Sequence, residues 1–246
     1  MAYAIARIAK LKGGSVSGSG KHVDRTRETP NADRHKKHEN KTLIGDERPL
    51  REVVTEMIER HGGKPRRDSV ECVELMLAAS PEHFTEGRDE INPERVREFT
   101  GKTVEFLREQ YGGRCVKAVL HMDEKTPHVQ AFVVPIDERG KLNCKSFFGS
   151  REKLRRFQDA FAEKMRPLGL ERGVEGSRAT HTDVQRFYGV IKEEVRLRVI
   201  HERVPDPPRS AESHYESSIQ RVGRANNTAN NRCRDRKPCV AQHRSQ

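Results

Sequence analysis

Histidine and acidic residues are concentrated in one short segment, residues 121–128, which reads His-Met-Asp-Glu-Lys-Thr-Pro-His. Apolar and β-branched residues flank it at 115–122 and 128–135, a pattern that predicts two antiparallel strands joined by a tight connection. A lone pair of histidines in such strands is most simply explained by packing. Here the polar residues are crowded into a turn between strand-forming sequences, which favours a chemical site instead.

Such a hairpin would bring four possible metal ligands together. Side chains two apart on a strand share one face, so His128 and Gln130 point the same way. The end of the partner strand would place His121 and Glu124 beside them. Two imidazoles, a carboxylate and an amide oxygen suit Mn²⁺ or Mg²⁺ better than a structural zinc ion, for which thiolates would be expected. The sequence therefore predicts a divalent-cation site that can bind a phosphate.

The composition favours a polyanionic partner. The chain of 246 residues has 48 Lys and Arg against 37 Asp and Glu, which gives a net charge of +11 and a sequence pI of about 9.6. Basic side chains that neutralise phosphates release condensed counterions, so nucleic acid is the first candidate. Aromatic residues make up only 5% of the chain, which gives an RNA-binding protein little support. The candidate phosphate contacts are Lys36, Lys37 and the segments 64–67, 151–156 and 232–237.

Other classes are disfavoured by what the sequence lacks. It has no stretch of about 18 apolar residues and no apolar signal core at its beginning, so we expect a cytoplasmic protein without stable membrane insertion. The 5 cysteines are scattered without a C-x-x-C pair, which predicts reduced thiols.

The surrounding elements predict an α+β fold, with an antiparallel sheet flanked by helices. Residues 1–200 would form one domain, and the basic, low-complexity residues 201–246 a disordered tail. The first part of the chain should hold a strand at 3–10, a mobile glycine- and serine-rich loop at 13–20, a polar surface segment at 21–41, a helix at 49–61 and a strand at 70–77. A helix capped by Asn92 should follow and end at 112–113, before the hairpin. After the hairpin we expect a helix capped by Ser150 and a helix at 182–197.

Three motifs in the same order resemble those of the MobV or Pre family of plasmid mobilisation and recombination relaxases. The segment from His121 to His128 resembles the metal-binding motif of that family. Residues 2–10, followed by Lys-His-x-x-Arg at 21–25, are similar to its first motif. Between them, His38-x-Asn40 resembles its intervening motif. The resemblance extends from residue 2 to about 190.

This resemblance implies a fold related to the HUH endonucleases and a reaction at a DNA phosphate. It assigns the nucleophile to His22 and metal ligation to His121, Glu124 and His128. The chain departs from the family pattern, which ends His-x-His, because Gln130 stands where the last histidine belongs. An amide oxygen can still serve a hard cation, so we expect weakened or magnesium-biased binding.

The expected reaction is metal-assisted transesterification, with His22, Arg25 and Glu124 as catalytic residues. A neutral His22 imidazole would attack the phosphorus and form a covalent 5′-phosphate adduct, which a free 3′ end can reverse. Arg25 would contact the phosphate and help to keep His22 neutral. The expected DNA contacts are Arg25, Lys36, Lys37, His38 and Asn40, and the tyrosines Tyr3, Tyr111, Tyr188 and Tyr215 are weaker candidates for the nucleophile.

The expected partner is plasmid DNA at an origin of transfer, single-stranded or in a hairpin, with a homodimer and a coupling protein as further possibilities. The sequence leaves two alternatives open. A non-catalytic, autoregulatory DNA-binding protein would keep the fold and lose the chemistry. A hydrolytic metallonuclease would share the metal cluster but would form no covalent adduct and would not need His22.

Overall fold

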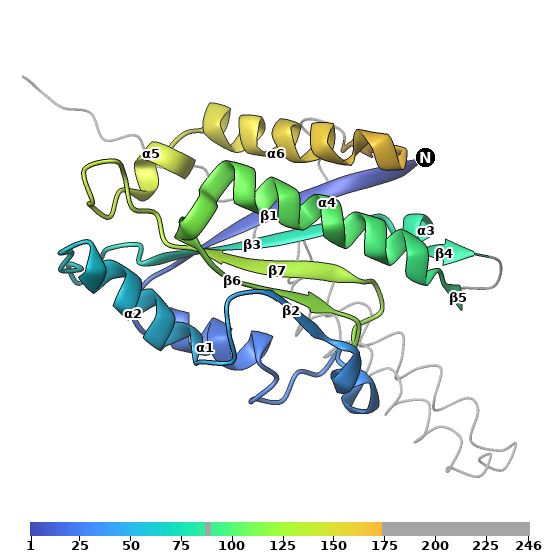
Figure 1. Ribbon diagram of the computed structural model, residues 1–246, viewed down its shortest axis with the longest axis horizontal. Coiled ribbons are helices and arrows are strands. Elements are labelled where there is room, and N and C mark those ends of the chain that lie inside the picture. Colours follow the sequence, from blue (N-terminus) through green and yellow to red (C-terminus); the bar gives the residue numbers. More distant parts are fainter. Residues whose placement is uncertain (87–89, 174–246) are drawn as a thin grey trace, which may run out of the picture. The chain divides into compact units, whose positions relative to one another are not determined.

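A computed structural model describes residues 1–86 and 90–173. In these residues the centre is a six-stranded sheet with the strand order β2-β6-β7-β3-β1-β8 (Figure 1). The hairpin strands β6 and β7 therefore lie near the middle of the sheet. The strands are β1 (Ala2–Leu11), β2 (Lys41–Ile44), β3 (Cys72–Ala79), β6 (Cys115–His121), β7 (His128–Val133) and β8 (Leu170–Arg172), and β4 (Thr85–Glu86) pairs separately with β5 (Glu90–Ile91).

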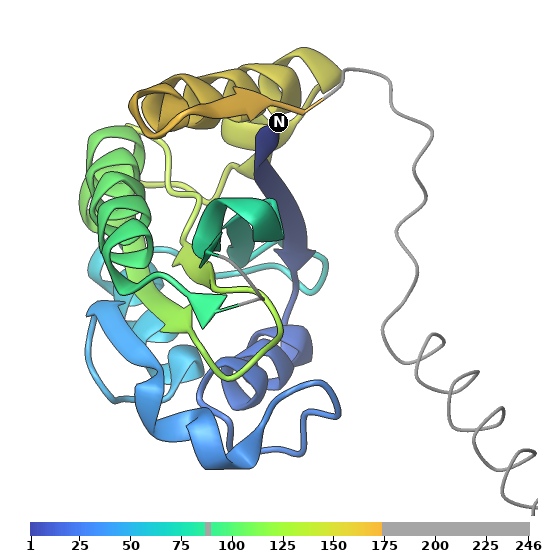
Figure 2. The same cartoon turned by 90° about the vertical axis from the view of Figure 1, so that its right-hand side faces the viewer.

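Helices cover both faces of the sheet. Figures 1 and 2 show α4 and α6 on one side and α1 and α2 on the other. This two-sided cover confirms the expected α+β class of helices around a sheet. The helices are α1 (Gly14–Val23), α2 (Leu50–Arg60), α3 (Pro81–Phe84), α4 (Pro93–Tyr111), α5 (Cys144–Phe148) and α6 (Arg151–Met165), with 3₁₀ turns η1 (Arg34–Glu39), η2 (Gly112–Arg114) and η3 (Arg166–Leu168).

The sheet is mixed rather than wholly antiparallel. Four strand pairs in it are antiparallel, including the expected β6–β7 hairpin, but β8 runs parallel to β1 at its edge. The sequence did not reveal β8 or β2, because strands of three and four residues are too short to display a period of two.

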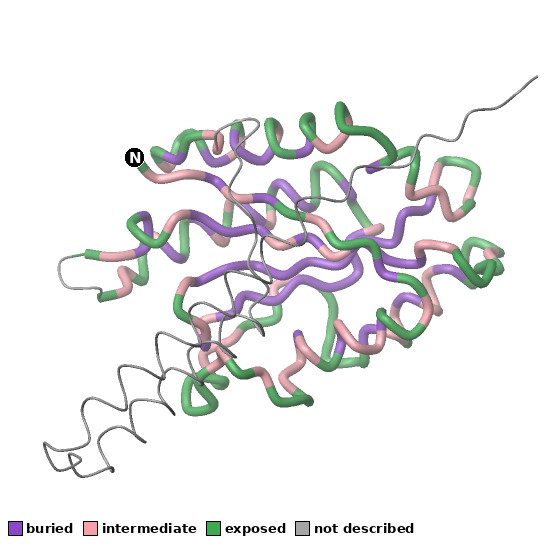
Figure 3. The backbone as a smooth tube through the Cα atoms, turned by 180° about the vertical axis from the view of Figure 1, so that it is seen from behind, coloured by how far each residue is buried: buried purple, intermediate pink, exposed green. Residues whose placement is uncertain are grey.

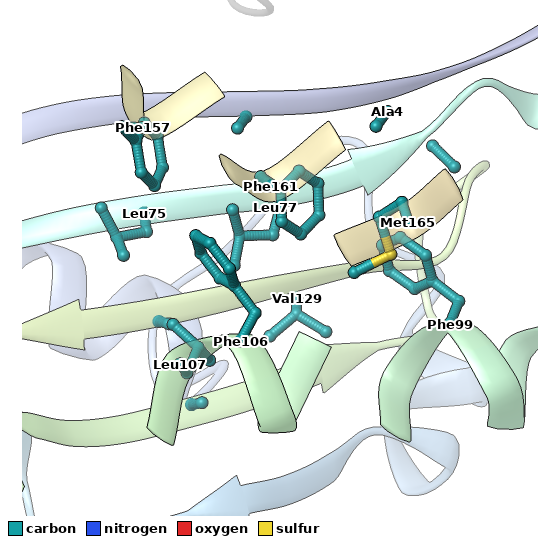
Figure 4. Close-up of a cluster of buried hydrophobic side chains, with 14 of the residues drawn as sticks. Ala4, Leu75, Leu77, Phe99, Phe106, Leu107, Val129, Phe157, Phe161 and Met165 are labelled. Atoms are coloured by element: carbon teal, nitrogen blue, oxygen red, sulfur yellow. The ribbon is translucent and has the colours of Figure 1, made fainter. Parts of the chain in front are cut away.

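The larger core lies between the sheet and the helices α4 and α6. Phe99 and Phe106 of α4 meet Phe157, Phe161 and Met165 of α6 over the inner face of the strands (Figure 4). Ring pairs at the junction, such as Phe106 and Phe161 with centroids 5.3 Å apart, pack edge to face. Figure 3 shows that the central strands are mostly buried, and β6 and β7 are buried at every residue, so this layer fixes the part of the sheet that carries the hairpin.

Residues 14–23 form helix α1, so the expected mobile loop at 13–20 is wrong. Glycine and serine have low helix propensity, but Val16, Gly20 and Val23 recur at helical spacing and are buried. They pack in a second core with Leu50 and other apolar residues of α2. Tertiary packing therefore overrides the local preference of the segment.

The expected helix caps are confirmed. The Asn92 side chain accepts hydrogen bonds from two backbone N–H groups of α4, and the Ser150 side chain caps α6. The expected helix at 182–197 and the expected tail lie outside the described residues, as does the predicted domain boundary at 200. In the part of the chain that is described, no helix is long and apolar enough to cross a membrane.

Candidate metal and nucleophile site

The β6–β7 hairpin places its two histidines opposite each other. His121 ends β6 and pairs with His128, which begins β7, and their ring centroids are 5.1 Å apart. Glu124 lies in the connection between them. One ligand atom from each of these three residues lies within 4.8 Å of the other two. The sequence-predicted residues therefore form a compact cluster on the sheet face that α1 covers.

Backbone carbonyls fix the tautomers of both histidines. His121 Nε2 lies 3.2 Å from Val23 O, and His128 Nδ1 lies 3.0 Å from Thr126 O. Because a carbonyl oxygen only accepts, each of these nitrogens carries the proton. The lone pairs therefore lie on His121 Nδ1, which is buried without a hydrogen-bond partner, and on His128 Nε2, which lies 4.0 Å from Glu124 Oε1.

Glu124 is oriented by two donors. Arg25 Nη2 donates to Glu124 Oε1 at 2.7 Å, and the amide of Asn31 donates to Oε2. Each carboxylate oxygen keeps a further lone pair, because an ionised carboxylate has about four acceptor positions. Glu124 is therefore held in place without losing its capacity to bind a cation.

Arg25 and Asp123 form a buried ion pair behind the cluster. Arg25 Nε and Nη2 donate to the two oxygens of Asp123 at 2.7 and 2.8 Å, and the side chains are 5% and 1% exposed. Burial opposes ionisation of Asp123, but hydrogen bonds from Arg25 and Asn40 outweigh it and lower its pKa to about 2. All the guanidinium nitrogens of Arg25 have partners in the protein, which favours a positioning role; its contact with a phosphate stays a prediction.

His22 lies in the last turn of α1, next to the cluster. Its ring centroid is 6.3 Å from that of His121. Burial, together with the nearby Arg25 guanidinium, lowers the pKa of His22 to about 4. Burial likewise lowers the pKa of His121 to about 3. Both imidazoles are therefore neutral at neutral pH, as ligation and nucleophilic attack require.

The hydrogen-bond partners of His22 distinguish its two nitrogens. Arg25 Nη1 lies 3.4 Å from Nε2, and Thr29 Oγ1 lies 3.4 Å from Nδ1. A guanidinium only donates, whereas a hydroxyl can accept. The lone pair of His22 therefore belongs on Nε2 and the proton on Nδ1.

The predicted DNA-contact residues lie beside this site, in and after η1. Lys36, Lys37 and His38 are exposed, and Lys37 Nζ donates to Arg25 O at 3.3 Å. Asn40 instead faces the turn, where its Oδ1 accepts from the backbone N–H groups of Met122 and Asp123. Contact of these side chains with DNA stays a prediction.

Gln130 lies on the same face of β7 as His128 and is 7% exposed. Its Nε2 donates to Glu74 Oε1 of β3, and its Oε1 has no hydrogen-bond partner. The position that a third histidine occupies in the family pattern is therefore filled by a buried carbonyl oxygen.

The donors fit a divalent cation. Protein ligands lie about 2 Å from such an ion, so two of them lie up to ~4 Å apart, and the cluster needs only a small contraction. His121 Nδ1 and Gln130 Oε1 are both buried without a hydrogen-bond partner. Buried polar atoms usually have a partner, and a bound cation would provide one for both. The mixture of nitrogen and oxygen donors without a thiolate suits Mn²⁺ or Mg²⁺.

Some of the remaining site residues have a signal in the sequence, and others have none. Asp123 lies within the motif, and Glu74 is a charged residue in an otherwise apolar strand. Thr29 and Asn31 precede η1 in a polar segment with no pattern that singles them out. Two of the candidate tyrosines lie away from the site: Tyr3 is the second residue of β1, and Tyr111 ends α4 in the large core. Tyr188 and Tyr215 lie outside the described residues.

A cavity of about 620 Å³ opens next to the last turn of α1. Its volume is in the range of sites that take small molecules. The walls combine basic and acidic side chains with the sheet edge. They include Lys21, Asp24, Arg25, Lys37, Asn40 and Arg51.

The fold and the site define an α+β protein in which two histidines and a glutamate of a hairpin, which could hold a metal ion, lie beside a neutral histidine. The sequence profile of the plasmid recombination enzyme family matches residues 1–189, and the chain belongs to this family. A 65 kDa protein of Zymomonas mobilis is 38% identical over 201 residues, which are 79% of this chain and 34% of that protein. A plasmid recombination enzyme of a Bacillus species is 35% identical and a type 3 enzyme of Staphylococcus aureus 32%, each over 76% of this chain. The chain spans about a third to a half of the length of these relatives.

Solved structures give the same result for the fold. The relaxase domain of MobM, in a Mn-bound crystal structure with plasmid pMV158 oriT DNA, superposes with a TM-score of 0.66 at 29% identity. The match covers 76% of this chain and 99% of that domain. A further structure of that domain, with a 26-nucleotide oriT DNA, has a TM-score of 0.59 at 29% identity. The described residues therefore have a relaxase fold.

Proposed function

We propose that this chain is a DNA relaxase, which nicks one strand and joins its 5′ end to His22. The observation that carries the proposal is the position of a neutral imidazole beside the His121–Glu124–His128 cluster. A nucleophile without a proton on the attacking atom and a cation site at the same phosphate are the two requirements of a metal-assisted transesterification.

The bond changes balance within one phosphodiester. The lone pair on His22 Nε2, released from its 3.4 Å contact with Arg25 Nη1, forms a nitrogen–phosphorus bond, and the bond from phosphorus to the 3′ oxygen breaks. The 3′ oxygen takes a proton from water, and the phosphorylated imidazole loses its Nδ1 proton to water, on the side of the ring that Thr29 Oγ1 contacts. A bound divalent cation would withdraw charge from the non-bridging oxygens and stabilise the leaving oxygen. Attack by a 3′ hydroxyl on the adduct reverses these changes and rejoins the strand.

The other residues position this pair. Arg25 links the carbonyl of His22 to the carboxylates of Asp123 and Glu124, so one guanidinium orients both the nucleophile and a metal ligand. Burial of His22 keeps its imidazole neutral through the pH range in which cells work. Glu124 and the histidines would hold Mn²⁺ or Mg²⁺, in line with the Mn-bound state of the MobM relaxase domain.

The proposed substrate is a single strand or hairpin at a plasmid origin of transfer. The MobM relaxase domain is bound to oriT DNA in its crystal structures, and the basic η1 segment here gives a phosphate-binding surface next to the site. A cytoplasmic location, a homodimer and a coupling protein remain predictions.

The proposal is tested with supercoiled DNA that carries the gene and its flanking sequence. The full chain is incubated with this DNA and Mn²⁺ or Mg²⁺, and relaxed circles and DNA-linked protein are scored on denaturing gels. We expect metal-dependent nicking with a covalent adduct that His22→Ala abolishes. His35→Ala, on the exposed face of η1, is the matched control and should keep the adduct.

Two outcomes would contradict the proposal. Nicking without an adduct, unaffected by His22→Ala, would indicate a hydrolytic nuclease. DNA binding without nicking in either metal would indicate a relaxase fold that serves DNA recognition alone, and recovery of nicking in Gln130→His would trace that loss to the altered ligand.

A further inference from the structure

Glu74 and Gln130 form a polar contact inside the sheet face that carries the metal cluster. Gln130 Nε2 donates to Glu74 Oε1 at 2.6 Å, between the neighbouring strands β7 and β3. Glu74 is the only acidic residue of β3, whose other members are apolar or small. Glu74 is half-buried, so partial desolvation opposes its charge, and its hydrogen bonds offset part of that cost.

The carboxylate decides which way the Gln130 amide faces. An ionised carboxylate accepts hydrogen bonds and cannot donate them, so the amide must turn its NH₂ group to Glu74. The carbonyl oxygen then points away from β3. Because β7 lies between β3 and β6 in the sheet, this direction leads to the side on which His121 lies. Gln130 Oε1 is buried there without a partner.

The position of Gln130 relative to the histidines is set by strand register. Gln130 follows His128 by two residues, so the side chains share a face about 7 Å apart along the strand. His128 pairs with His121 across β6. Gln130 Oε1 and His121 Nδ1 are therefore two buried, unpartnered acceptors on the same sheet face, on the neighbouring strands β7 and β6.

A second contact ties the pair to helix α1. Ser19 Oγ donates to Glu74 Oε2 at 2.8 Å, so both oxygens of the carboxylate are engaged. Ser19 precedes His22 by three residues on the same helix, and the two therefore lie on one side of it. The chain of contacts from Ser19 through Glu74 to Gln130 connects the helix of the nucleophile to the ligand set.

We propose that Glu74 is a positioning residue for the metal centre, which fixes the Gln130 amide so that its carbonyl oxygen is an oxygen ligand for a hard divalent cation. The inference rests on the metal site of the proposed function, and it adds a residue that orients one ligand of that site without contacting the ion. Residues of this kind, which orient a ligand without touching the ion, typically change metal affinity by 10- to 100-fold. A carbonyl in place of an imidazole also favours Mn²⁺ and Mg²⁺ over nitrogen-preferring ions such as Ni²⁺.

The test is calorimetric titration of the full, metal-free chain with Mn²⁺. Glu74→Met removes the acceptor at similar volume and should weaken Mn²⁺ binding about tenfold or more. Glu74→Gln keeps an oxygen that accepts from the Gln130 amide, and we expect it to stay within about threefold of the unsubstituted chain. Equal weakening by both variants would overturn the proposal, because it would show that Glu74 acts through its charge rather than through the amide.

A Gln130→Ala background separates positioning from structural damage. If Glu74 acts through Gln130, Glu74→Met has no further effect on Mn²⁺ affinity once Gln130 is alanine. A tenfold loss in both backgrounds would overturn the inference, and thermal unfolding in EDTA checks that each variant is folded. His128→Ala tests the metal centre itself: Mn²⁺ binding that it leaves intact would contradict the proposed site, whereas binding lost in His128→Ala but unchanged in Glu74→Met would contradict only the role of Glu74.

Discussion

At the scale of residues, the buried guanidinium of Arg25 holds the parts of the site together. Arg25 adopts a left-handed backbone conformation, with φ of 51°, two residues after the end of α1. That conformation is disfavoured for a residue with a β-carbon, and the hydrogen bonds to Asp123, Glu124 and His22 O offset it. The side chain thus connects the end of the helix to the hairpin turn.

Loss of one partner should reveal how much the fold depends on this ion pair. Asp123→Asn leaves the buried Arg25 charge incompletely compensated, and we expect the free energy of unfolding to fall by about 3 kcal/mol. Glu86→Gln breaks the exposed pair with Arg95 and is the matched control, with an expected change below about 0.5 kcal/mol. Urea denaturation of both variants measures the difference. Similar values for the two would show that burial adds nothing to the Arg25 contact.

The buried histidines predict a pH dependence for the metal-free protein. His22 and His121 have pKa values of about 4 and about 3 in the folded state, below the ordinary value of 6.5. Between pH 6.5 and 4 the unfolded chain binds protons that the folded chain does not, so stability falls as the pH falls through this window. The pKa of Asp123, about 2, adds its loss only below its ordinary value of 3.8.

Urea denaturation in EDTA at a series of pH values from 7.5 to 4.5 tests this dependence. We expect His22→Asn to reduce the slope of stability against pH, since asparagine does not titrate. An unchanged slope in that variant would show that His22 does not titrate below its ordinary range on folding.

The members of the His121–Glu124–His128 cluster are predictable from the sequence, whereas the residues that orient them are not. His121, Glu124 and His128 lie within eight positions of one chain segment, so local spacing reveals them. Asn31 and Glu74 act from other segments of the chain, and only the folded arrangement brings them to Glu124 and Gln130. Local pattern carries no information about such long-range contacts.

At the scale of elements, α1 depends on its contact with α2. A β-carbon built at Gly20 would lie 3.0 Å from Leu50 Cβ, whereas one at Gly18 would meet nothing within 4 Å. The absence of a side chain at Gly20 therefore lets the two helices approach closely. This close approach places the last turn of α1, with His22, against the sheet.

Paired substitutions in α1 should have opposite signs. Gly20→Ala overpacks the α1–α2 contact, and we expect a loss of about 1–2 kcal/mol in stability. Gly18→Ala has room for its methyl group and gains helix propensity, so we expect a stabilisation of about 0.5–1 kcal/mol. Thermal unfolding compares the variants. Stabilisation by both would show that the α1–α2 contact at Leu50 has room for a methyl group at position 20.

Helices were predictable where their own sequence carries the signal, and not where packing against another helix determines them. Helices α2, α4 and α6 display apolar periodicity and caps in their own sequence, and they were predicted. Helix α1 consists of glycine, serine and a few apolar residues, and its helical state comes from packing against α2. Its local composition favours a loop, so the prediction there was wrong.

At the scale of the whole molecule, the net charge is +11, and some of the basic side chains that produce it are exposed near the site. The exposed lysines of η1, Lys36 and Lys37, adjoin the hairpin turn, because Asp33 N donates to Asp123 O at 2.7 Å. The α4 face lies on the other side of the sheet and carries basic residues such as Arg97 and Lys102. Only the first group is placed to contact a strand that enters the cluster.

This asymmetry predicts different salt dependences for two charge-matched variants. Each phosphate contact with a single strand adds about 0.7 to the slope of log K against log salt. Lys36→Gln/Lys37→Gln should therefore reduce the slope for single-stranded DNA by about 1.4, if both lysines meet phosphates. Arg97→Gln/Lys102→Gln removes the same charge from α4 and should leave the slope nearly unchanged. Fluorescence anisotropy with a labelled oligonucleotide at several salt concentrations measures both. Equal reductions would mean that DNA responds to the total charge of the protein, and that η1 is not its path to His22.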